Sequence, residues 1–423
     1  MIITIIAFVI VFGVLVTVHE FGHYYVAKRS GILVREFSIG MGPKLFAYRK
    51  NGTTYTIRIL PLGGYVRMAG LDDEDALQKG MAALLTTDDD EVVRTIDLRR
   101  DHPSLTGLPL EVTDWDLQDK LWIEGYETGA GEEVHRFKVA RDATVVEPDG
   151  TPVQVAPRDV QYQSVSVWKL MLTNVAGPFN NVLLAIAAFM LVAFLHGGAP
   201  QVTNAVGRVE PHSVAQKAGL RANDQILRVA GHKTTNWTEL TRAIEQRGGQ
   251  KTTFTVRRGH RVRQMTLTPK VVKQNGKRLG QIGIMGKVVL NHHFFTMVGY
   301  GFTQTWTMTK ALFGALGTMI THGFHLNDLG GPVAMFSYTE HAAKQGLISI
   351  VSLTAFLSIN LAIINLLPIP ALDGGKILLN LIEAVRRKPI SQKVEETLTL
   401  IGFGFLMVLM FLVTWNDLRR YFF

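Results

Sequence analysis

Four long apolar stretches alternate with polar segments along this chain. Each stretch has roughly 20 mostly apolar residues, the length with which an α-helix crosses a bilayer. The first carries no charged residue from Met1 to Val18, and the other three lie at 168–197, 347–375 and 397–415. The pattern therefore predicts a polytopic α-helical membrane protein with four transmembrane helices.

The first apolar stretch begins where a secretory signal peptide would also lie. It lacks the basic residues that open a signal peptide and an Ala-x-Ala-like cleavage site. It also runs directly into the polar cluster His19–His23, which would have no use in a discarded segment. We therefore interpret it as a retained span.

Apolar and polar residues alternate after the first span. The stretch Thr54–Ile59 alternates strictly, and the turn-forming sequence Pro61-Leu62-Gly63-Gly64 follows it. Alternation of this kind beside glycines is typical of a half-buried β-hairpin. We expect a membrane-associated hairpin or sheet here, which either binds substrate or only anchors the first span.

The next segment is acidic at its start and shows strand-like patches later. Its acidic runs are Asp72–Asp75 and Asp88–Glu91, which are most simply explained as solvated surface. We expect a cytoplasmic insert of mixed secondary structure at 71–167. Its role does not follow from the sequence.

A second polar segment, after the second span, has a familiar order of elements. The sequence Ser213–Leu220 predicts a short helix that ends at Ala-Gly-Leu, and Asn223–Gly231 predicts a turn into a strand. The segment resembles the bacterial form of the PDZ domain (α+β), although Asn223 stands where Gly is more usual before Asp224. PDZ domains bind peptides by adding a strand to a sheet edge. The alternative role is that of a spacer or a steric plug.

Composition agrees with a membrane protein of several domains. The chain has 423 residues, of which 47% are hydrophobic and only 19% are charged, so it is too apolar for an ordinary soluble enzyme. The predicted parts are the first span (1–27), the hairpin region (28–70), the insert (71–167), the second span (168–197), one PDZ domain (198–288), an amphipathic connector (289–346), the third span (347–375), a cytoplasmic loop (376–396), the fourth span (397–415) and a C-terminal tail (416–423).

The net charge of +9 is informative about orientation rather than about nucleic acid, because the basic residues are scattered and form no aromatic-interleaved patch. Lys28 and Arg29 follow the first span, and Arg386–Lys388 lie between the third and fourth. The positive-inside rule places both groups in the cytoplasm. This predicts a multi-pass protein of the bacterial cell membrane with both termini and the PDZ domain outside, although Arg419 and Arg420 oppose that orientation. The chain has no cysteine, which excludes a disulfide or thiolate site.

The first apolar stretch contains the most informative motif. His19-Glu20-Phe21-Gly22-His23 introduces two imidazoles and a carboxylate at membrane depth, where an ionisable group is costly and indicates function. On a helix, His19 and His23 share a face and can hold one metal ion, with Glu20 beside them. The alternative is a chance pentapeptide on a soluble helix, which the surrounding apolar run disfavours.

A second intramembrane acid, Asp373, lies at the end of the third span in the sequence Asn365–Gly375. Pro368 and Pro370 prevent a continuous helix, and irregular backbone at membrane depth is tolerated only where protein buries it or where it lines a watery cavity. With the two histidines, Asp373 would give three protein ligands and leave a fourth zinc position open. Considered alone, the motif is equally well a span end with a capping Asp and turn glycines.

The two motifs together resemble those of the site-2 protease family of intramembrane zinc metalloproteases, which has HExxH in its first span and Asn-x-x-Pro-x-Pro-x-Leu-Asp-Gly in its third. Shorter matches are Gly63–Val66, Ala176–Pro178 with Asn181, Gly331–Val333 and Thr414–Asp417. The resemblance covers nearly the whole chain and is closest to the bacterial RseP/RasP type. The single PDZ copy and the insert indicate its Gram-positive members.

The resemblance implies a chemical role for four residues. His19, His23 and Asp373 would ligate one Zn²⁺ ion. Glu20 would act as general base toward the attacking water and return the proton to the leaving amine.

The resemblance and the hairpin pattern also suggest where a substrate would bind. The hairpin strand near Thr54–Ile59, with the loop that follows it, would present an unpaired edge to an extended substrate. The polar side chains of the third span would hydrogen-bond the substrate backbone, or else would only join helices to one another. The expected substrate-binding residues are Asn360, Asn365, Gly64, Tyr65, Val66, Pro368 and Pro370.

We therefore expect a zinc-dependent intramembrane endopeptidase that carries out regulated intramembrane proteolysis of single-span membrane proteins. The expected partners are transmembrane substrates such as anti-sigma factors that another protease has already cut, and signal-peptide remnants in the membrane, but no nucleic acid. The alternatives are a non-proteolytic PDZ-bearing membrane scaffold and a metal transporter. Glu20 argues against both, because neither binding nor transport needs a general base.

Overall fold

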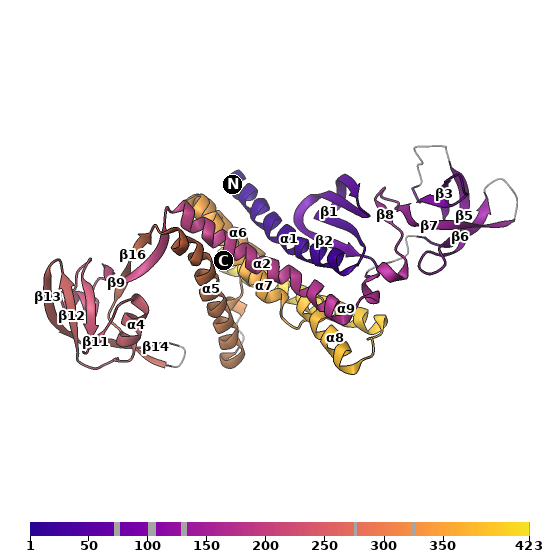
Figure 1. Ribbon diagram of the computed structural model, residues 1–423. Coiled ribbons are helices and arrows are strands. Elements are labelled where there is room, and N and C mark those ends of the chain that lie inside the picture. Colours follow the sequence, from indigo (N-terminus) through magenta and orange to yellow (C-terminus); the bar gives the residue numbers. More distant parts are fainter. Residues whose placement is uncertain (72–76, 100–106, 128–132, 275–276, 324–325, 423) are drawn as a thin grey trace. The chain divides into compact units, whose positions relative to one another are not determined.

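The computed structural model describes residues 1–71, 77–99, 107–127, 133–274, 277–323 and 326–422 (Figure 1). The chain divides into two compact units. One comprises Met1–Ile186 with His325–Phe423, and the other comprises Ala187–Phe324. The first unit contains both predicted motifs, and the second contains the segment that resembles a PDZ domain.

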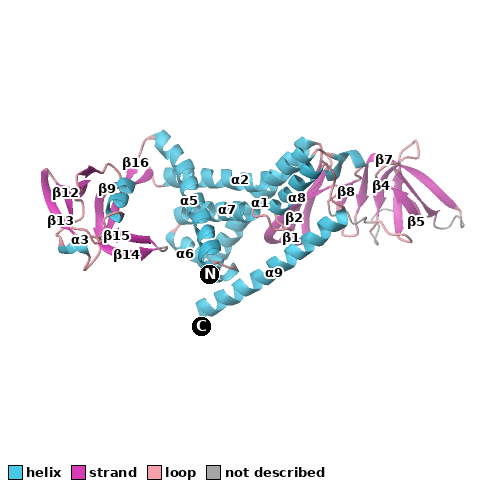
Figure 2. Ribbon diagram, turned by 90° about the horizontal axis from the view of Figure 1, so that it is seen from below, coloured by secondary structure: helices cyan, strands magenta, loops and turns pink. Residues whose placement is uncertain are grey.

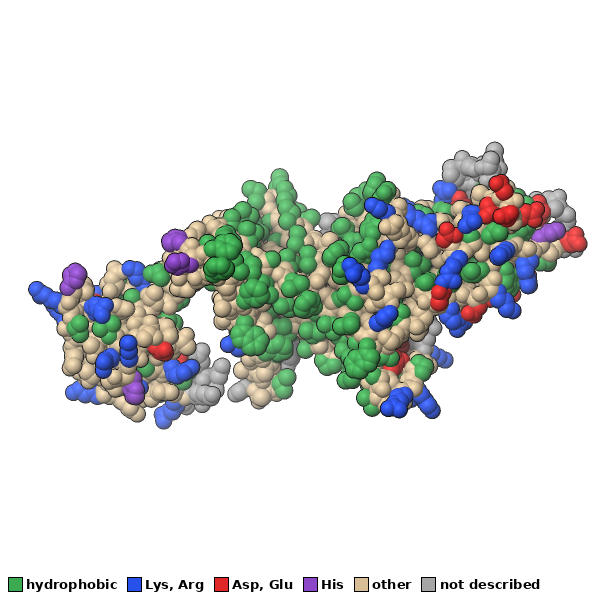
Figure 3. Space-filling view, in the orientation of Figure 1, with side chains coloured by type: hydrophobic (Ala, Val, Ile, Leu, Met, Phe, Trp, Pro, Cys, Tyr) green, Lys and Arg blue, Asp and Glu red, His purple; other side chains and the backbone are tan. Residues whose placement is uncertain are grey.

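Four helices of the described residues are long and apolar enough to cross a membrane. They are α1 (Ile2–Ser30), α2 (Val167–Leu195), α7 (Leu347–Asn365) and α9 (Gln392–Phe422). Each covers or overlaps one predicted span. Hydrophobic side chains gather on the surface over the helices, whereas acidic and basic side chains are dense over the insert (Figure 3). These features are those of a membrane protein.

The third span ends where the prolines require it. Helix α7 stops at Asn365, an irregular segment carries Pro368 and Pro370, and α8 (Asp373–Arg386) begins at the predicted metal ligand. The expectation of a cytoplasmic loop at 376–396 is wrong at the level of secondary structure, because α8 fills its first half. That expectation gave weight to the basic residues near position 387 and neglected the helical spacing of apolar residues before them.

The hairpin region is more folded than a simple hairpin. Strands β1 (Val34–Lys50) and β2 (Thr53–Met68) both bend, so that Thr54–Ile57 has Cα partners in Phe46–Arg49 and also in Glu36–Ile39. The expectation that the stretch near Thr54–Ile59 is an open edge is therefore wrong, because it lies inside the sheet. The outer stretch is Gly64–Met68, which has Cα partners only in β1 within the part of the chain that the structure describes.

Large apolar side chains remain exposed on this hairpin, as expected where a sheet meets lipid. They include Ile39, Met41, Leu45, Phe46, Ile57, Ile59 and Leu60. Both views show β1 and β2 between α1 and the insert (Figures 1 and 2).

The insert is a β domain, not the mixed structure that we expected. Its strands are β3 (Ala82–Thr87), β4 (Val93–Asp97), β5 (Leu108–Asp116), β6 (Trp122–Glu127), β7 (Val134–Val146) and β8 (Pro152–Gln154), and two 3₁₀ turns, η1 (Arg158–Val160) and η2 (Tyr162–Ser164), lead into α2. The strand order is β4-β3-β5-β6-β7-β8, and an additional β4–β7 pairing closes the ring. Leu85, Ile96 and Leu110 are fully buried inside it.

The structure describes one of the two acidic runs of the insert. Asp88 accepts the N–H of Val92 and pairs with Arg94, so it stabilises the β3–β4 turn in addition to being solvated. The run Asp72–Asp75 lies outside the described residues.

The turn between β7 and β8 docks the insert onto the hairpin. Glu147 forms an ion pair with Arg67 at 2.7 Å, and both side chains are largely buried. Lys44 donates to the carbonyl of Asp149 and to the hydroxyl of Thr151, each at 3.2 Å. One short turn thus contacts two parts of the hairpin: the outer stretch of β2 at Arg67, and β1 at Lys44.

The second unit contains the elements that the PDZ resemblance predicts, and three further strands follow them. The predicted elements are β9 (Ala199–Val209), α3 (Val214–Lys217), β10 (Gln225–Val229), β11 (His232–Lys233), α4 (Trp237–Glu245), β12 (Thr252–Arg258) and β13 (Arg261–Leu267), and the further strands are β14 (Lys270–Gln274), β15 (Lys277–Gln281) and β16 (Ile284–Asn291). The main sheet has the order β13-β12-β10-β9-β16, with β11 paired to β10. Phe254, Leu240 and Ile226 are fully buried in its core.

The departure at Asn223 has a physical explanation. Its φ of 68° lies in the left-handed region, which Gly adopts freely and Asn tolerates. The next residue, Asp224, is buried and forms an ion pair with Arg258 at 2.7 Å. Burial alone would raise the pKa of Asp224, but the hydrogen bonds from Arg258 and from the N–H of Arg221 outweigh it and hold that pKa below its ordinary value. Asp224 therefore stays charged and anchors this turn.

The predicted amphipathic connector is two long helices and a 3₁₀ turn. In the second unit, α5 (Phe294–His322) folds back along the end of α2, with ring contacts between Phe194 and Phe294 and between Phe189 and Tyr300. In the first unit, η3 (Leu326–Asp328) precedes α6 (Pro332–Gln345), which packs against α1, α7 and α9.

The C-terminal motif Thr414–Asp417 and the motif Gly331–Val333 contact each other. The buried carboxylate of Asp417 accepts the N–H groups of Gly331 and Ala334, both at 2.9 Å. These are the N-cap and third residues of α6, and Pro332 between them has no N–H to satisfy. A residue of α9 thus caps α6.

Replacing Asp417 by Ala should destabilise the first unit by about 1–2 kcal/mol, because it removes a cap and leaves two buried N–H groups without their acceptor. Thermal unfolding in detergent would show a lowered Tm. The matched control is Asn416→Ala, which removes one exposed hydrogen bond to Asn327. Equal Tm values for the two variants would contradict this account of the cap.

Candidate metal centre

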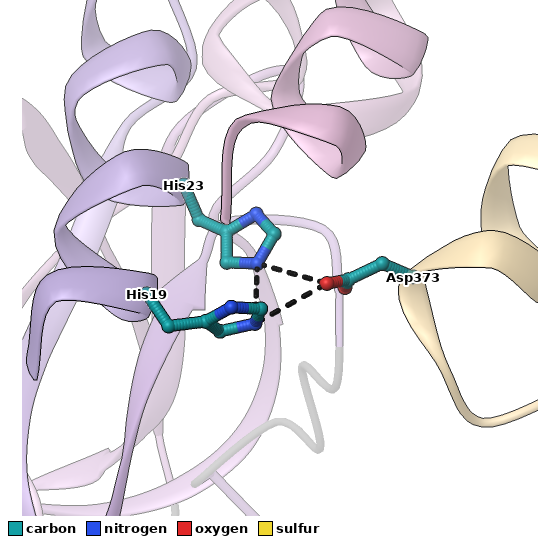
Figure 4. A group of neighbouring side chains, drawn as sticks. All are labelled: His19, His23 and Asp373. Atoms are coloured by element: carbon teal, nitrogen blue, oxygen red, sulfur yellow. Dashed lines mark hydrogen bonds and ion pairs between the residues drawn. The ribbon is translucent and has the colours of Figure 1, made fainter. Parts of the chain in front are cut away.

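Two helices bring the predicted ligands together. His19 and His23 lie one turn apart on α1, and Asp373 opens α8 (Figure 4). Asp373 Oδ2 lies 3.2 Å from His19 Nε2 and 3.3 Å from His23 Nε2, and the two Nε2 atoms are 3.2 Å apart. Both histidines are buried and Asp373 is partly buried. Residues at least 350 positions apart therefore form one cluster, as the two motifs predict.

Helix α2 approaches this cluster so closely that only glycine fits. A Cβ on Gly22 would lie 2.3 Å from the carbonyl oxygen of Ala176, and a Cβ on Gly177 would lie 2.2 Å from His23 Nε2. Within the sequence Ala176–Pro178, Gly177 is thus the residue against which the two imidazoles pack. Its match to the family motif has a steric cause.

The same helix supplies hydrogen-bond partners to both imidazoles. Nδ1 of His23 donates to the carbonyl of Thr173 at 2.7 Å, and Nδ1 of His19 lies 3.1 Å from the side-chain amide of Asn181. A donor at Nδ1 of a neutral histidine leaves a lone pair on Nε2. The lone pair of His23 therefore faces the carboxylate of Asp373.

This arrangement fits a cation. Two imidazole nitrogens and a carboxylate oxygen converge within 4.8 Å of one another, and with their lone pairs directed at one another they would repel unless a positive charge lay between them. The buried Asp373 Oδ2 has no hydrogen-bond donor of good geometry among the described residues. Two imidazole nitrogens and one carboxylate oxygen are one of the donor sets found in catalytic zinc sites.

The hairpin also approaches Glu20, the predicted general base beside this cluster. A Cβ on Gly64 would lie 3.3 Å from Val16 and 3.7 Å from Cγ of Glu20. Gly64, the first residue of the outer stretch Gly64–Met68, therefore lies beside Glu20. The predicted substrate residues Gly64, Tyr65 and Val66 belong to this stretch.

The side chain of Tyr65 has a structural partner. Burial, and then the negative charge of Glu36, raise the pKa of Tyr65 to about 12, so its hydroxyl remains protonated and hydrogen-bonds Glu36. Glu36 is fully buried and also forms an ion pair with Arg58 at 2.8 Å. The backbone of Tyr65, rather than its hydroxyl, is what remains for a substrate.

The residues predicted in the third span divide into two groups. Asn365 belongs to the cluster, because its Nδ2 lies 3.4 Å from His19 Nε2. Asn360 instead donates to the carbonyl of Phe356 on its own helix at 3.0 Å. Pro368 and Pro370 lie in the irregular segment between α7 and α8, where the carbonyl of Pro370 is 1.9 Å from the position of a Cβ on Gly402.

The sequence analysis did not identify two residues of α2 that contact the histidines. Thr173 binds through its backbone carbonyl, so its side-chain type carries no information about the contact. Asn181 was recognised only as part of a motif. The four-residue spacing of Thr173, Gly177 and Asn181 would have placed all three on one face of α2.

Comparison with known proteins gives the same class of protein. The model of Peptidase family M50 matches residues 7–409. "Probable protease eep" of Enterococcus faecalis is 48% identical over 99% of this chain and all of its own length. Proteins named "Putative zinc metalloprotease" are 48% identical in Streptococcus pyogenes serotype M1 and 46% identical in Lactococcus lactis, over at least 99% of both chains.

A PDZ domain of an SdrC-like protein from Listeria innocua aligns with 22% of this chain and 99% of its own, at 21% identity and a TM-score of 0.18. That score is too low to add to the fold described above.

The fold, the cluster and the relatives define a zinc-dependent metalloprotease with membrane helices. The chain belongs to Peptidase family M50, the site-2 protease family, and resembles its Gram-positive members. The scaffold and transporter alternatives receive no support from these relatives.

Substituting Gly177 by Ala should weaken zinc binding roughly 10- to 100-fold, the range for lost support of metal ligands. The new methyl group would collide with His23 Nε2 and displace that ring. Zinc content of the purified variant, measured by elemental analysis and chelator competition, tests this. Gly13→Ala is the control, because a Cβ there meets nothing within 4 Å. Full zinc occupancy in Gly177→Ala at the affinity of the control would refute the steric argument.

Proposed function

We propose that this protein is an intramembrane endopeptidase that cuts single-span membrane proteins within or near their membrane segment. One observation carries the proposal. His19 and His23 lie on the apolar helix α1, and Asp373 opens α8 after the irregular segment that follows the apolar helix α7. Gly64, at the start of the outer stretch Gly64–Met68, lies beside Glu20. A catalytic group and an open strand edge are thus adjacent within the part of the protein that is built to lie in lipid.

In this proposal His19, His23 and Asp373 hold the zinc ion. Bound zinc lowers the pKa of water toward neutrality and polarises a carbonyl group. Glu20 follows His19 on the same helix, and its carboxylate takes a proton from the attacking water and delivers it to the leaving amine. The amide of Asn365, close to His19, is placed to hydrogen-bond the substrate near the bond that is cut.

The outer stretch would bind the substrate segment after its helix has unwound. Peptide bonds of a helix are engaged in i→i−4 hydrogen bonds, so a segment must unwind before it can be cut. Unwinding exposes backbone groups that are costly in lipid. Pairing with Gly64–Met68 would satisfy them and present the substrate as an extended strand beside Glu20.

Substrates and orientation belong to the same proposal. The substrates are transmembrane proteins that another protease has shortened, such as anti-sigma factors, and signal-peptide remnants. The protein lies in the bacterial cell membrane with the PDZ domain and both termini outside, which the basic residues flanking α1 and α8 support.

Glu20→Gln should keep zinc and lose roughly 10²- to 10⁴-fold in cleavage rate, because the ligands remain while the proton acceptor is gone. The assay is cleavage of a tagged model transmembrane segment by purified protein in detergent, with zinc measured in parallel. Asp373→Ala and His23→Ala are the comparison, since both should lose zinc and cleavage together. Wild-type cleavage by Glu20→Gln would show that Glu20 is not the base.

Proline in the outer stretch should weaken substrate binding while zinc stays bound. The N–H groups of successive residues point to opposite sides of a strand. One of the two variants Tyr65→Pro and Val66→Pro therefore removes a hydrogen bond to β1, and the other removes an N–H donor at the open edge. Loss of one hydrogen bond of about 0.5–1.5 kcal/mol corresponds to roughly 2- to 12-fold in kcat/KM.

The control is Tyr48→Pro, at the other outer stretch of the hairpin. It perturbs the sheet to a similar degree but lies away from Glu20. If both Tyr65→Pro and Val66→Pro fold and cut as Tyr48→Pro does, the hairpin is only an anchor.

A further inference from the structure

Helix α2 holds both imidazoles of the cluster from one face. Thr173, Gly177 and Asn181 are spaced by four residues, so they lie on a single stripe of the helix. Thr173 meets His23, Asn181 meets His19, and Gly177 leaves room for both rings between them. The two contacts are alike in position, because each is made at Nδ1 and leaves Nε2 directed to the cluster.

The two contacts differ in chemistry as they stand. The carbonyl of Thr173 can only accept, so Nδ1 of His23 carries the hydrogen. At His19 the amide nitrogen Nδ2 of Asn181 faces Nδ1, which would make Nδ1 an acceptor and place the hydrogen on Nε2. A hydrogen on Nε2 would point into the cluster and prevent His19 from binding a metal.

The opposite orientation of the amide removes this conflict. Asn181 is fully buried, and its Oδ1 has no hydrogen-bond partner within the described part of the chain. The oxygen and nitrogen of an amide are distinguished only by their hydrogen bonds. Turning the amide places Oδ1 at 3.1 Å from Nδ1 of His19, where it accepts the hydrogen.

We propose that Asn181 is a positioning residue that accepts the Nδ1 hydrogen of His19 and so keeps Nε2 free for zinc. It does for His19 what the Thr173 carbonyl does for His23. Its own place is secured from a third helix, because Ser358 of α7 donates to the backbone carbonyl of Asn181 at 2.7 Å. This inference rests on the ligand role of His19 in the proposed function.

The test compares zinc affinity, measured by chelator competition, in four variants of the full-length protein. Asn181→Leu removes the acceptor with little change in volume and should weaken zinc binding roughly 10- to 100-fold, the range for lost partners of metal-bound histidines. Asn181→Asp keeps an acceptor and should bind zinc at least as well as the wild type. The control Asn180→Leu removes a hydrogen bond to the carbonyl of Val18 without touching a ligand and should leave affinity unchanged.

The leucine variant decides the orientation of the amide. If the amide nitrogen donated to His19, it would hold the hydrogen on Nε2, so Asn181→Leu would bind zinc as well as the wild type or better, which would overturn the proposal. Zinc binding by Asn181→Asp as weak as that of Asn181→Leu would overturn it as well, because an acceptor at this position would then give no support to His19. Should Asn181→Leu fail to fold, Asn181→Ser, which is smaller and too short to reach His19, takes its place with the same expected loss.

The fourth variant, His19→Ala, separates this inference from the proposed function. If His19→Ala retains zinc, the ligand assignment itself is wrong. If His19→Ala loses zinc while Asn181→Leu does not, the ligand assignment stands and only the role of Asn181 fails.

Discussion

The close approach of α1 to α2 is the constraint on which the rest of the site depends. The side chains of a metal site must be held rigidly, because a displaced lone pair no longer points at the metal ion. Gly22 and Gly177 allow the two helices to touch through backbone atoms, and the histidine rings then fill the space that side chains would otherwise take. Small residues that permit such contact are the usual means by which membrane helices associate.

Asp373, the third member of the cluster, is held in place in a different way. Asp373 follows an irregular segment whose backbone groups would be costly in lipid, and glycines shield that segment by allowing close packing. A Cβ on Gly374 would lie 2.3 Å from the carbonyl of Leu367, and one on Gly402 of α9 would overlap the carbonyl of Pro370. Helix α9 therefore covers the segment that presents Asp373, and Asp417 at its far end caps α6. A span without catalytic residues thus supports both the metal cluster and the helix packing around it.

Much of this could be predicted from the sequence, and the limits have physical causes. The cluster of His19, His23 and Asp373 was predictable, because HExxH places two imidazoles on one helical face and because prolines force a break before Asp373. The path of the hairpin was not, since alternation in Thr54–Ile59 shows that a strand has two faces but says nothing of how many neighbours it has. The closed β domain of the insert was missed because most of its strands are short and its longest strand, β7, carries many charged residues.

An ion pair joins the insert to the hairpin and helps to fix the position of the outer stretch. Arg67 belongs to the same outer stretch as Gly64 and pairs with Glu147 of the insert, while Arg58 pairs with the buried Glu36 beneath it. Removing one partner of such a pair costs more than the pair contributes, because the other charge is left desolvated. The hairpin is therefore held on one side by α1 and on the other by a separate β domain. The stretch beside Glu20 owes its position to both.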